Sequence, residues 1–142
     1  MLSGDVNGVV RLRNTDEQDI KLGLAGRLGY RIGELGQVTV TPEGMFAWER
    51  FGDDANNLIR VVGGLRIAGG NVFQPSVFGH VGWGRRNFSG THENGTAVDG
   101  GVALDLQVGE PLMVGVHGAY NLILLDESID FVSFGAHFTI AF

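Results

Sequence analysis

The last twelve residues carry the pattern that most constrains the fold of this chain. From Phe131 to Phe142 an apolar residue alternates with a small or polar one. Successive side chains of a β-strand point to opposite faces, so this segment has one apolar and one polar face. The apolar face holds Val132, Phe134, Ala136, Phe138, Ile140 and Phe142, and the other holds Ser133, Gly135, His137 and Thr139. Such a strand separates an apolar environment from a polar one.

The same alternation recurs along the whole chain and predicts a single all-β domain over residues 1–142. Connections near 33–36, 69–71 and 109–111 are short and glycine-containing, whereas those at 14–17, 52–56, 86–95 and 125–128 are polar or longer. Short and long connections therefore alternate, and an even strand number places both termini at one end. The eight expected strands are 5–13, 18–32, 36–51, 57–69, 72–85, 96–108, 111–124 and 129–142.

Composition narrows the class further. With 44% apolar and 18% charged residues, the chain is too hydrophobic for disorder. It contains no apolar stretch of about 18 residues, which a membrane-spanning helix needs. Glycine is abundant, at 24 of 142 residues, as expected for a crowded barrel wall, and cysteine is absent. The net charge of -6 argues against nucleic acid as a partner. Met1-Leu-Ser-Gly4 lacks the features of a signal peptide, so we expect a mature form.

Alternation alone leaves two barrels open, because a soluble lipocalin-like barrel has the same pattern turned inside out. Long charged residues share one face with many small ones, which suits a narrow interior. The expected strand lengths also suit a tilted crossing of a bilayer. Aromatic residues gather near the two expected ends, as membrane-interface girdles do. We therefore favour the membrane barrel, with girdles formed by Tyr30, Phe73 and Phe142 at one end and Trp48, Trp83 and Tyr120 at the other.

Two segments, Gly115-Val-His-Gly-Ala-Tyr-Asn121 and Phe134-Gly-Ala-His-Phe-Thr-Ile-Ala-Phe142, resemble the small OmpA/OmpX-type outer-membrane barrels. The resemblance extends over the whole chain. It implies an eight-stranded antiparallel up-and-down transmembrane β-barrel in a bacterial outer membrane, with short periplasmic turns and longer external loops. It also implies an assembly signal for the outer-membrane assembly machinery in the last strand, at Phe134, Phe138, Ile140 and Phe142.

The polar faces predict a charged interior. Buried charges persist only when they are paired or solvated, so we expect an interlocked network that plugs the lumen. A narrow conduit for ions or small solutes is the first alternative. The predicted inward groups are Arg11, Arg13, Lys21, Arg27, Arg31, Arg60 and Arg66 together with Asp5, Glu43, Glu49, Asp99 and Asp105.

The histidines invite catalytic and metal readings. His80, His117 and His137 all fall on the inward face, where the fold itself calls for polar residues. None lies at a zinc-motif spacing from another, so we expect no metal and no cofactor. His137 and Thr139 resemble the His-x-Ser pair of a lipid-A deacylase barrel. Threonine replaces serine and the pair should face the lumen, so we expect no enzyme, and a lipid-acting enzyme remains an alternative.

Acidic residues gather at the expected external end. A solvated rim explains them simply, and a sharper hypothesis is that they share divalent cations with lipopolysaccharide. Within the glycine-rich loop 86–95, His92 and Glu93 are expected at a mobile tip. The acidic set is Asp16, Glu17, Asp19, Asp53, Asp54, Glu93, Asp126, Glu127 and Asp130.

The sequence thus predicts a monomeric, integral outer-membrane barrel with a structural or cell-surface role. Its expected partners are outer-membrane lipids, lipopolysaccharide and the assembly machinery. A soluble ligand-binding barrel remains the last alternative.

Overall fold

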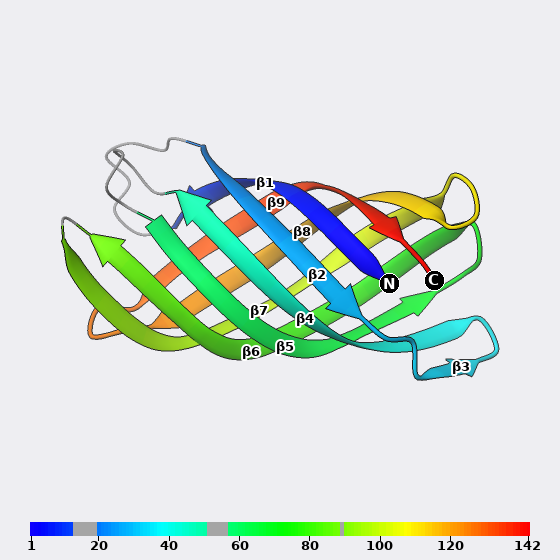
Figure 1. Ribbon diagram of the computed structural model, residues 1–142, viewed down its shortest axis with the longest axis horizontal. Coiled ribbons are helices and arrows are strands. Elements are labelled where there is room, and N and C mark those ends of the chain that lie inside the picture. Colours follow the sequence, from blue (N-terminus) through cyan, green and yellow to red (C-terminus); the bar gives the residue numbers. More distant parts are fainter. Residues whose placement is uncertain (13–19, 51–56, 89) are drawn as a thin grey trace.

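The computed structural model describes residues 1–12, 20–50, 57–88 and 90–142, and within them the chain forms a β-barrel (Figure 1). No helix among these residues is long and apolar enough to cross a membrane. The strands are β1 (Leu2–Arg11), β2 (Lys21–Gly29), β3 (Gly33–Leu35), β4 (Val38–Arg50), β5 (Asn57–Gly69), β6 (Phe73–Phe88), β7 (Thr91–Gln107), β8 (Leu112–Leu124) and β9 (Ile129–Ile140).

Eight long strands close into a ring in which every pairing is antiparallel. Neighbours in the chain are neighbours in the sheet, β1 pairs with β9, and β2 pairs with β4. The short strand β3 pairs with the start of β4 and continues the line of β2. Between them the Tyr30 amide donates to the Pro42 carbonyl and the Ile32 amide donates to the Val40 carbonyl, each at 3.0 Å. The predicted eight-stranded up-and-down barrel is therefore confirmed.

Both termini lie at one end of the barrel, together with the connections 70–72 and 108–111 (Figure 1). The predicted turn at 33–36 is shifted, because the chain pairs through β3 before it reverses at Gly36, whose φ is +65°. Glycine adopts this conformation without steric cost, so the hairpin can be tight there. We call the end of the barrel that holds both termini the terminal end, and the opposite end the loop end.

The prediction of a long external loop at 86–95 is wrong. These residues extend β6 and β7 into one continuous hairpin, which pairs Arg86 with Glu93 and Asn87 with His92. The chain reverses beside Gly90, whose φ is +87°. Polar cross-strand contacts support the ladder, since His92 Nδ1 lies 2.7 Å from Asn87 Oδ1 and Asn87 Nδ2 donates to Asn57 Oδ1 at 2.6 Å. The polar composition of 86–95 predicts a loop because composition does not reveal these cross-strand contacts.

The apolar faces point outward around the barrel. Leu22 and Phe138 are each 54% exposed, Leu104 46% and Val114 39%. The opposite faces are buried and rich in polar residues. This is the orientation expected for a barrel in lipid, and the inside-out arrangement of a lipocalin-like barrel does not hold.

The first and last strands meet at a seam in which aromatic rings cover glycines. Gly4 pairs with Phe138 and Gly8 pairs with Phe134. A Cβ atom at either glycine would lie 3.0 Å from the facing phenylalanine ring. The rings therefore lie against the bare backbone of β1, which keeps β1 and β9 closely packed on the outer surface.

Candidate functional site

The lumen contains the largest concentration of chemically active side chains, and Arg60 lies at its centre. Its guanidinium donates to both carboxylate oxygens of Glu49, to Asp99 at 3.3 Å and to the Asn121 side-chain oxygen at 2.6 Å. Arg60 and Glu49 are 2% and 0% exposed. The three partners come from β4, β7 and β8, so one residue of β5 links strands across the lumen.

His80 connects this group to the next. Its Nδ1 lies 2.6 Å from Asp99 Oδ1 and its Nε2 lies 2.9 Å from Glu43 Oε1. Glu43 also accepts from the Arg66 Nε at 3.1 Å, and Arg66 Nη1 lies 3.7 Å from Asp105 Oδ2. The network therefore continues without a break toward the terminal end.

The terminal end of the lumen holds a second cluster. Arg27 donates to both oxygens of Asp5, at 2.5 and 3.0 Å, and Thr139 donates to Ser3 at 3.0 Å. His137 Nε2 lies 2.5 Å from Asp105 Oδ1. Asp105 therefore joins the two clusters, since it contacts both His137 and Arg66.

An apolar cluster occupies the loop end of the same lumen. Its members are exposed by at most 6%, and the Arg60 guanidinium carbon lies 5.3 Å from the centre of the Phe131 ring. Sequence reasoning missed this cluster because it treated the inward face as polar throughout. The available signal was the strand parity, which puts these residues on the same face as the charges. The cluster is Val9, Leu58, Val62, Ala97, Ile123, Ile129 and Phe131.

The space left between these side chains is small. One lumen cavity, lined among others by Asn7, His80 and His117, has a volume of about 20 Å³. Another near the terminal end, lined among others by Arg31 and Arg66, has about 20 Å³ as well. Such a volume holds one or two water molecules. Within the described residues, neither cavity offers a passage for solutes.

The predicted lumen charges divide into a buried set and a peripheral set. Arg11 and Arg31 are exposed and Lys21 is half-buried, so these three are not among the fully buried charges. Arg11 ends β1 and Arg31 follows β2, and at these positions long side chains reach the mouths of the barrel. Arg13 lies outside the described residues. The buried members are Asp5, Arg27, Glu43, Glu49, Arg60, Arg66, Asp99 and Asp105.

The aromatic residues predicted as girdles lie on the outer face. Tyr30, Phe73 and Phe142 are exposed and lie close to the terminal end, where β2 and β9 end and β6 begins. Trp83 and Tyr120 are exposed and Trp48 is half-buried, each in the half of its strand nearer the loop end. The residues predicted as an assembly signal also face outward, with Phe134 45%, Phe138 54%, Ile140 39% and Phe142 89% exposed.

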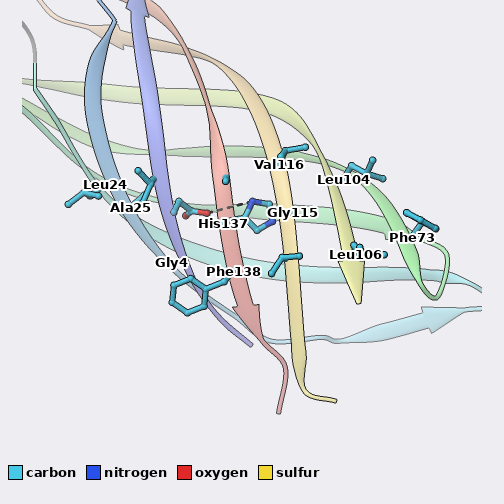
Figure 2. Close-up of a pocket in the computed structure, with 14 residues that line it drawn as sticks. Gly4, Leu24, Ala25, Phe73, Leu104, Leu106, Gly115, Val116, His137 and Phe138 are labelled. Atoms are coloured by element: carbon cyan, nitrogen blue, oxygen red, sulfur yellow. Dashed lines mark ion pairs between the residues drawn. The ribbon is translucent and has the colours of Figure 1, made fainter. Parts of the chain in front are cut away.

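An apolar hollow lies on this outer face and is lined by residues of β1, β2, β6, β7, β8 and β9. Its rim includes Phe73, Leu104, Leu106 and Phe138, which project from the wall in Figure 2. The surface is suited to acyl chains because it presents hydrocarbon groups in a concave shape.

The acidic rim is only partly described. Asp16, Glu17, Asp19, Asp53 and Asp54 lie outside the described residues. Asp126 and Glu127 are exposed between β8 and β9. Glu93 lies 3.7 Å from Arg86, and the Tyr120 hydroxyl donates to Asp130 at 3.3 Å. Two of the four described carboxylates thus have partners within the chain.

The His137 and Thr139 pair faces the lumen. Both side chains are at most 5% exposed, and each is engaged inside, His137 with Asp105 and Thr139 with Ser3. An imidazole and a hydroxyl in this position do not reach a lipid ester on the outer surface.

The described residues form a closed ring of eight antiparallel strands, apolar outside and charged within, which is the fold of small outer-membrane β-barrels. No family model matches the chain, and no curated protein matches it. Solved structures do. Neisserial surface protein A (NspA) has a TM-score of 0.74 at 10% identity and covers 99% of this chain and 96% of its own. Ail, the attachment invasion locus protein of Yersinia pestis, has a TM-score of 0.60 at 14% identity, with coverages of 99% and 96%.

The outer membrane enzyme PagL is similar as well, with a TM-score of 0.56 at 12% identity and coverages of 97% and 99%. At these identities the likeness shows the fold alone. The same fold therefore occurs in a surface protein, in an attachment invasion locus protein and in an enzyme, so the fold does not decide the role of this chain.

Proposed function

We propose that the protein is an integral barrel of a bacterial outer membrane with a structural or cell-surface role and a plugged lumen. The observation that carries this proposal is the pairing of an apolar outer wall with a packed lumen. Leu22, Leu104 and Phe138 present hydrocarbon to the surroundings, while Arg60 and Arg66 hold carboxylates inside. An exposed apolar wall of this extent is stable only in lipid or detergent.

The apolar outer wall of the barrel also supports the proposed partners. Outer-membrane lipids and lipopolysaccharide are the proposed surroundings, with acyl chains against the apolar faces and interface aromatics at the two rims. The outward row Phe134, Phe138, Ile140 and Phe142 is the proposed signal for the assembly machinery. We propose a monomer, because the ring leaves none of its eight long strands without a partner on either side.

The absence of enzymatic activity is part of the proposal. It is supported by His137 and Thr139, which are engaged inside the barrel, whereas a lipid-acting pair must face the substrate. Lipid A that keeps its mass after incubation with the folded protein is the expected result.

The test begins with folding from urea into detergent micelles and lipid vesicles. We expect folding that depends on detergent or lipid, and a gel mobility that changes when the sample is boiled. In planar bilayers we expect no steady, large single-channel conductance. Folding in plain buffer would contradict the membrane barrel, and a stable open channel would contradict the plugged lumen and favour the conduit.

A further inference from the structure

Three metal-ligating side chains from three strands converge near the terminal end of the lumen. Asp5 belongs to β1, His117 to β8 and His137 to β9. The Nδ1 atoms of His117 and His137 are 3.1 Å apart, and His137 Nδ1 lies 3.9 Å from Asp5 Oδ1. One ligand atom from each residue fits within 4.8 Å of the others. The dashed line at His137 in Figure 2 marks its ion pair with Asp5.

The register of the sheet and one glycine bring this cluster together. Asp5 pairs directly with His137, and His117 pairs with Gly135, two residues away along β9. A Cβ atom at Gly115, opposite His137, would lie 2.6 Å from the His137 Nε2. Gly115 therefore leaves room in the wall for the His137 imidazole.

Asp105 orients one of these ligands. His137 Nε2 lies 2.5 Å from Asp105 Oδ1, and because a carboxylate accepts, this nitrogen carries the proton. In the neutral ring Nδ1 then presents a lone pair to His117 and Asp5. A carboxylate that holds the far nitrogen of a histidine is the usual second partner of metal-binding imidazoles.

An independent observation concerns Asn7, whose side chain is 5% exposed. Its Oδ1 is buried and has no hydrogen-bond partner, although nearly all buried polar atoms have one. Asn7 lines the same small cavity as Asp5 and His117. A buried oxygen without a partner, in the cavity that Asp5 and His117 also line, points to a ligand that accepts electron pairs.

The charge of the lumen agrees with a cation. Among the buried charged residues that the structure describes, three guanidinium groups face five carboxylates. The guanidinium groups are Arg27, Arg60 and Arg66, and the carboxylates are Asp5, Glu43, Glu49, Asp99 and Asp105.

We propose that Asp5, His117 and His137 form a binding site for a divalent transition-metal ion of the zinc type, with Asn7 Oδ1 or water as a further ligand. Two imidazoles on a tetrahedral zinc ion have nitrogens about 3.3 Å apart, close to the spacing seen here. Imidazole ligands select such ions over calcium and magnesium, which prefer oxygen. The bound ion links β1, β8 and β9 inside the barrel, beside the seam. This goes beyond the structural role proposed above.

The test uses zinc and cobalt with the whole chain. The protein is folded into detergent micelles with zinc, passed through a desalting column and analysed for metal, and cobalt is added to a second, metal-free sample. We expect one zinc ion per chain and the strong visible absorption of tetrahedral cobalt. His117→Gln and His137→Gln should each abolish retention, and Asp105→Asn should weaken zinc affinity by roughly 10- to 100-fold.

His92→Gln is the matched control, because His92 is exposed on β7 and outside the cluster. Heat-modifiable gel mobility verifies that every variant is folded. The proposal is overturned if the wild-type protein retains no more zinc than the folded double variant of His117→Gln and His137→Gln. It is also overturned if His92→Gln removes the metal, or if cobalt gives only the weak absorption of an octahedral ion.

Discussion

The two ends of the lumen are closed by different chemistry. At the loop end, Phe131 and Leu58 pack in an apolar cluster. Below it and toward the terminal end, Arg60, Arg66 and Arg27 are held by carboxylates. Both regions use the same inward face of the same strands. A barrel interior can therefore pack apolar side chains at one end and pair buried charges elsewhere, so the polarity of the lumen changes along the barrel axis.

Removing Arg60 should have the largest effect on stability, because Arg60 is buried and pairs with the buried carboxylates of Glu49 and Asp99. Arg60→Met leaves the buried Glu49 carboxylate without its cation and Asp99 with His80 alone, which costs about 3–5 kcal/mol. Urea titration in lipid vesicles measures the free energy of unfolding. Arg31→Met, at the exposed terminal mouth, is the control and should cost less than about 1 kcal/mol. Equal losses in the two variants would show that the network does not stabilise the lumen.

Truncating Phe131 tests the apolar end. Phe131→Ala removes a fully buried ring and should cost about 3 kcal/mol by the loss of burial and the cavity that remains. Conductance in planar bilayers should stay low, because the charged network still fills the barrel beneath the cluster. Phe46→Ala, on the outer wall and 53% exposed, is the control for a lost ring. A large steady current in Phe131→Ala would assign the closure to the apolar cluster alone.

Much of the fold was predictable because the alternation is continuous. The period of two, once it is anchored at Phe134 and Phe138, fixes which side chains share a face along each strand. The change from apolar to charged side chains along the lumen was not predictable in this way. Phe131 and Leu58 lie on the same strand faces as the charged residues and differ from them only in their position along the barrel axis. The contact between His117 and His137 depends on the register between β8 and β9, which the spacing of residues in the chain does not reveal.

The error at 86–95 has a related cause. Asn87, His92 and Glu93 are residues typical of loops, yet they satisfy one another or their neighbours across the strands. Cross-strand pairing can stabilise polar sequence in a hairpin, and composition does not detect it.

Two alanine substitutions in β8 test how tightly the barrel wall is packed beside Asp5, His117 and His137. In Gly115→Ala the new Cβ would meet Asp105 Oδ1 at 2.7 Å and the Leu104 carbonyl at 2.7 Å, which should cost about 1–3 kcal/mol. In Gly118→Ala the nearest atom is 4.0 Å away, and the change should be neutral or stabilise by up to about 1 kcal/mol. Urea titration of the two variants measures and compares their free energies of unfolding. Similar values would mean that the inward side of β8 has spare room.

The smallest effect is expected at the loop-end rim. Glu93→Gln removes a partly exposed ion pair with Arg86 at 3.7 Å and should change stability by less than about 0.5 kcal/mol. The difference should shrink further in high salt, because ions screen exposed charges. A loss that rivals that of Arg60→Met would contradict the distinction between rim and lumen.

The seam between β1 and β9 has a consequence for the order of events in biogenesis. Ser3 donates to the Phe138 carbonyl across 135 positions of the chain, and the phenylalanine rings beside this bond rest on Gly4 and Gly8. Contacts between such distant residues form late, because the chain between them must be ordered first. Because Phe138 follows Ser3 by 135 residues, we expect β1 and β9 to pair after the hairpins between them have formed.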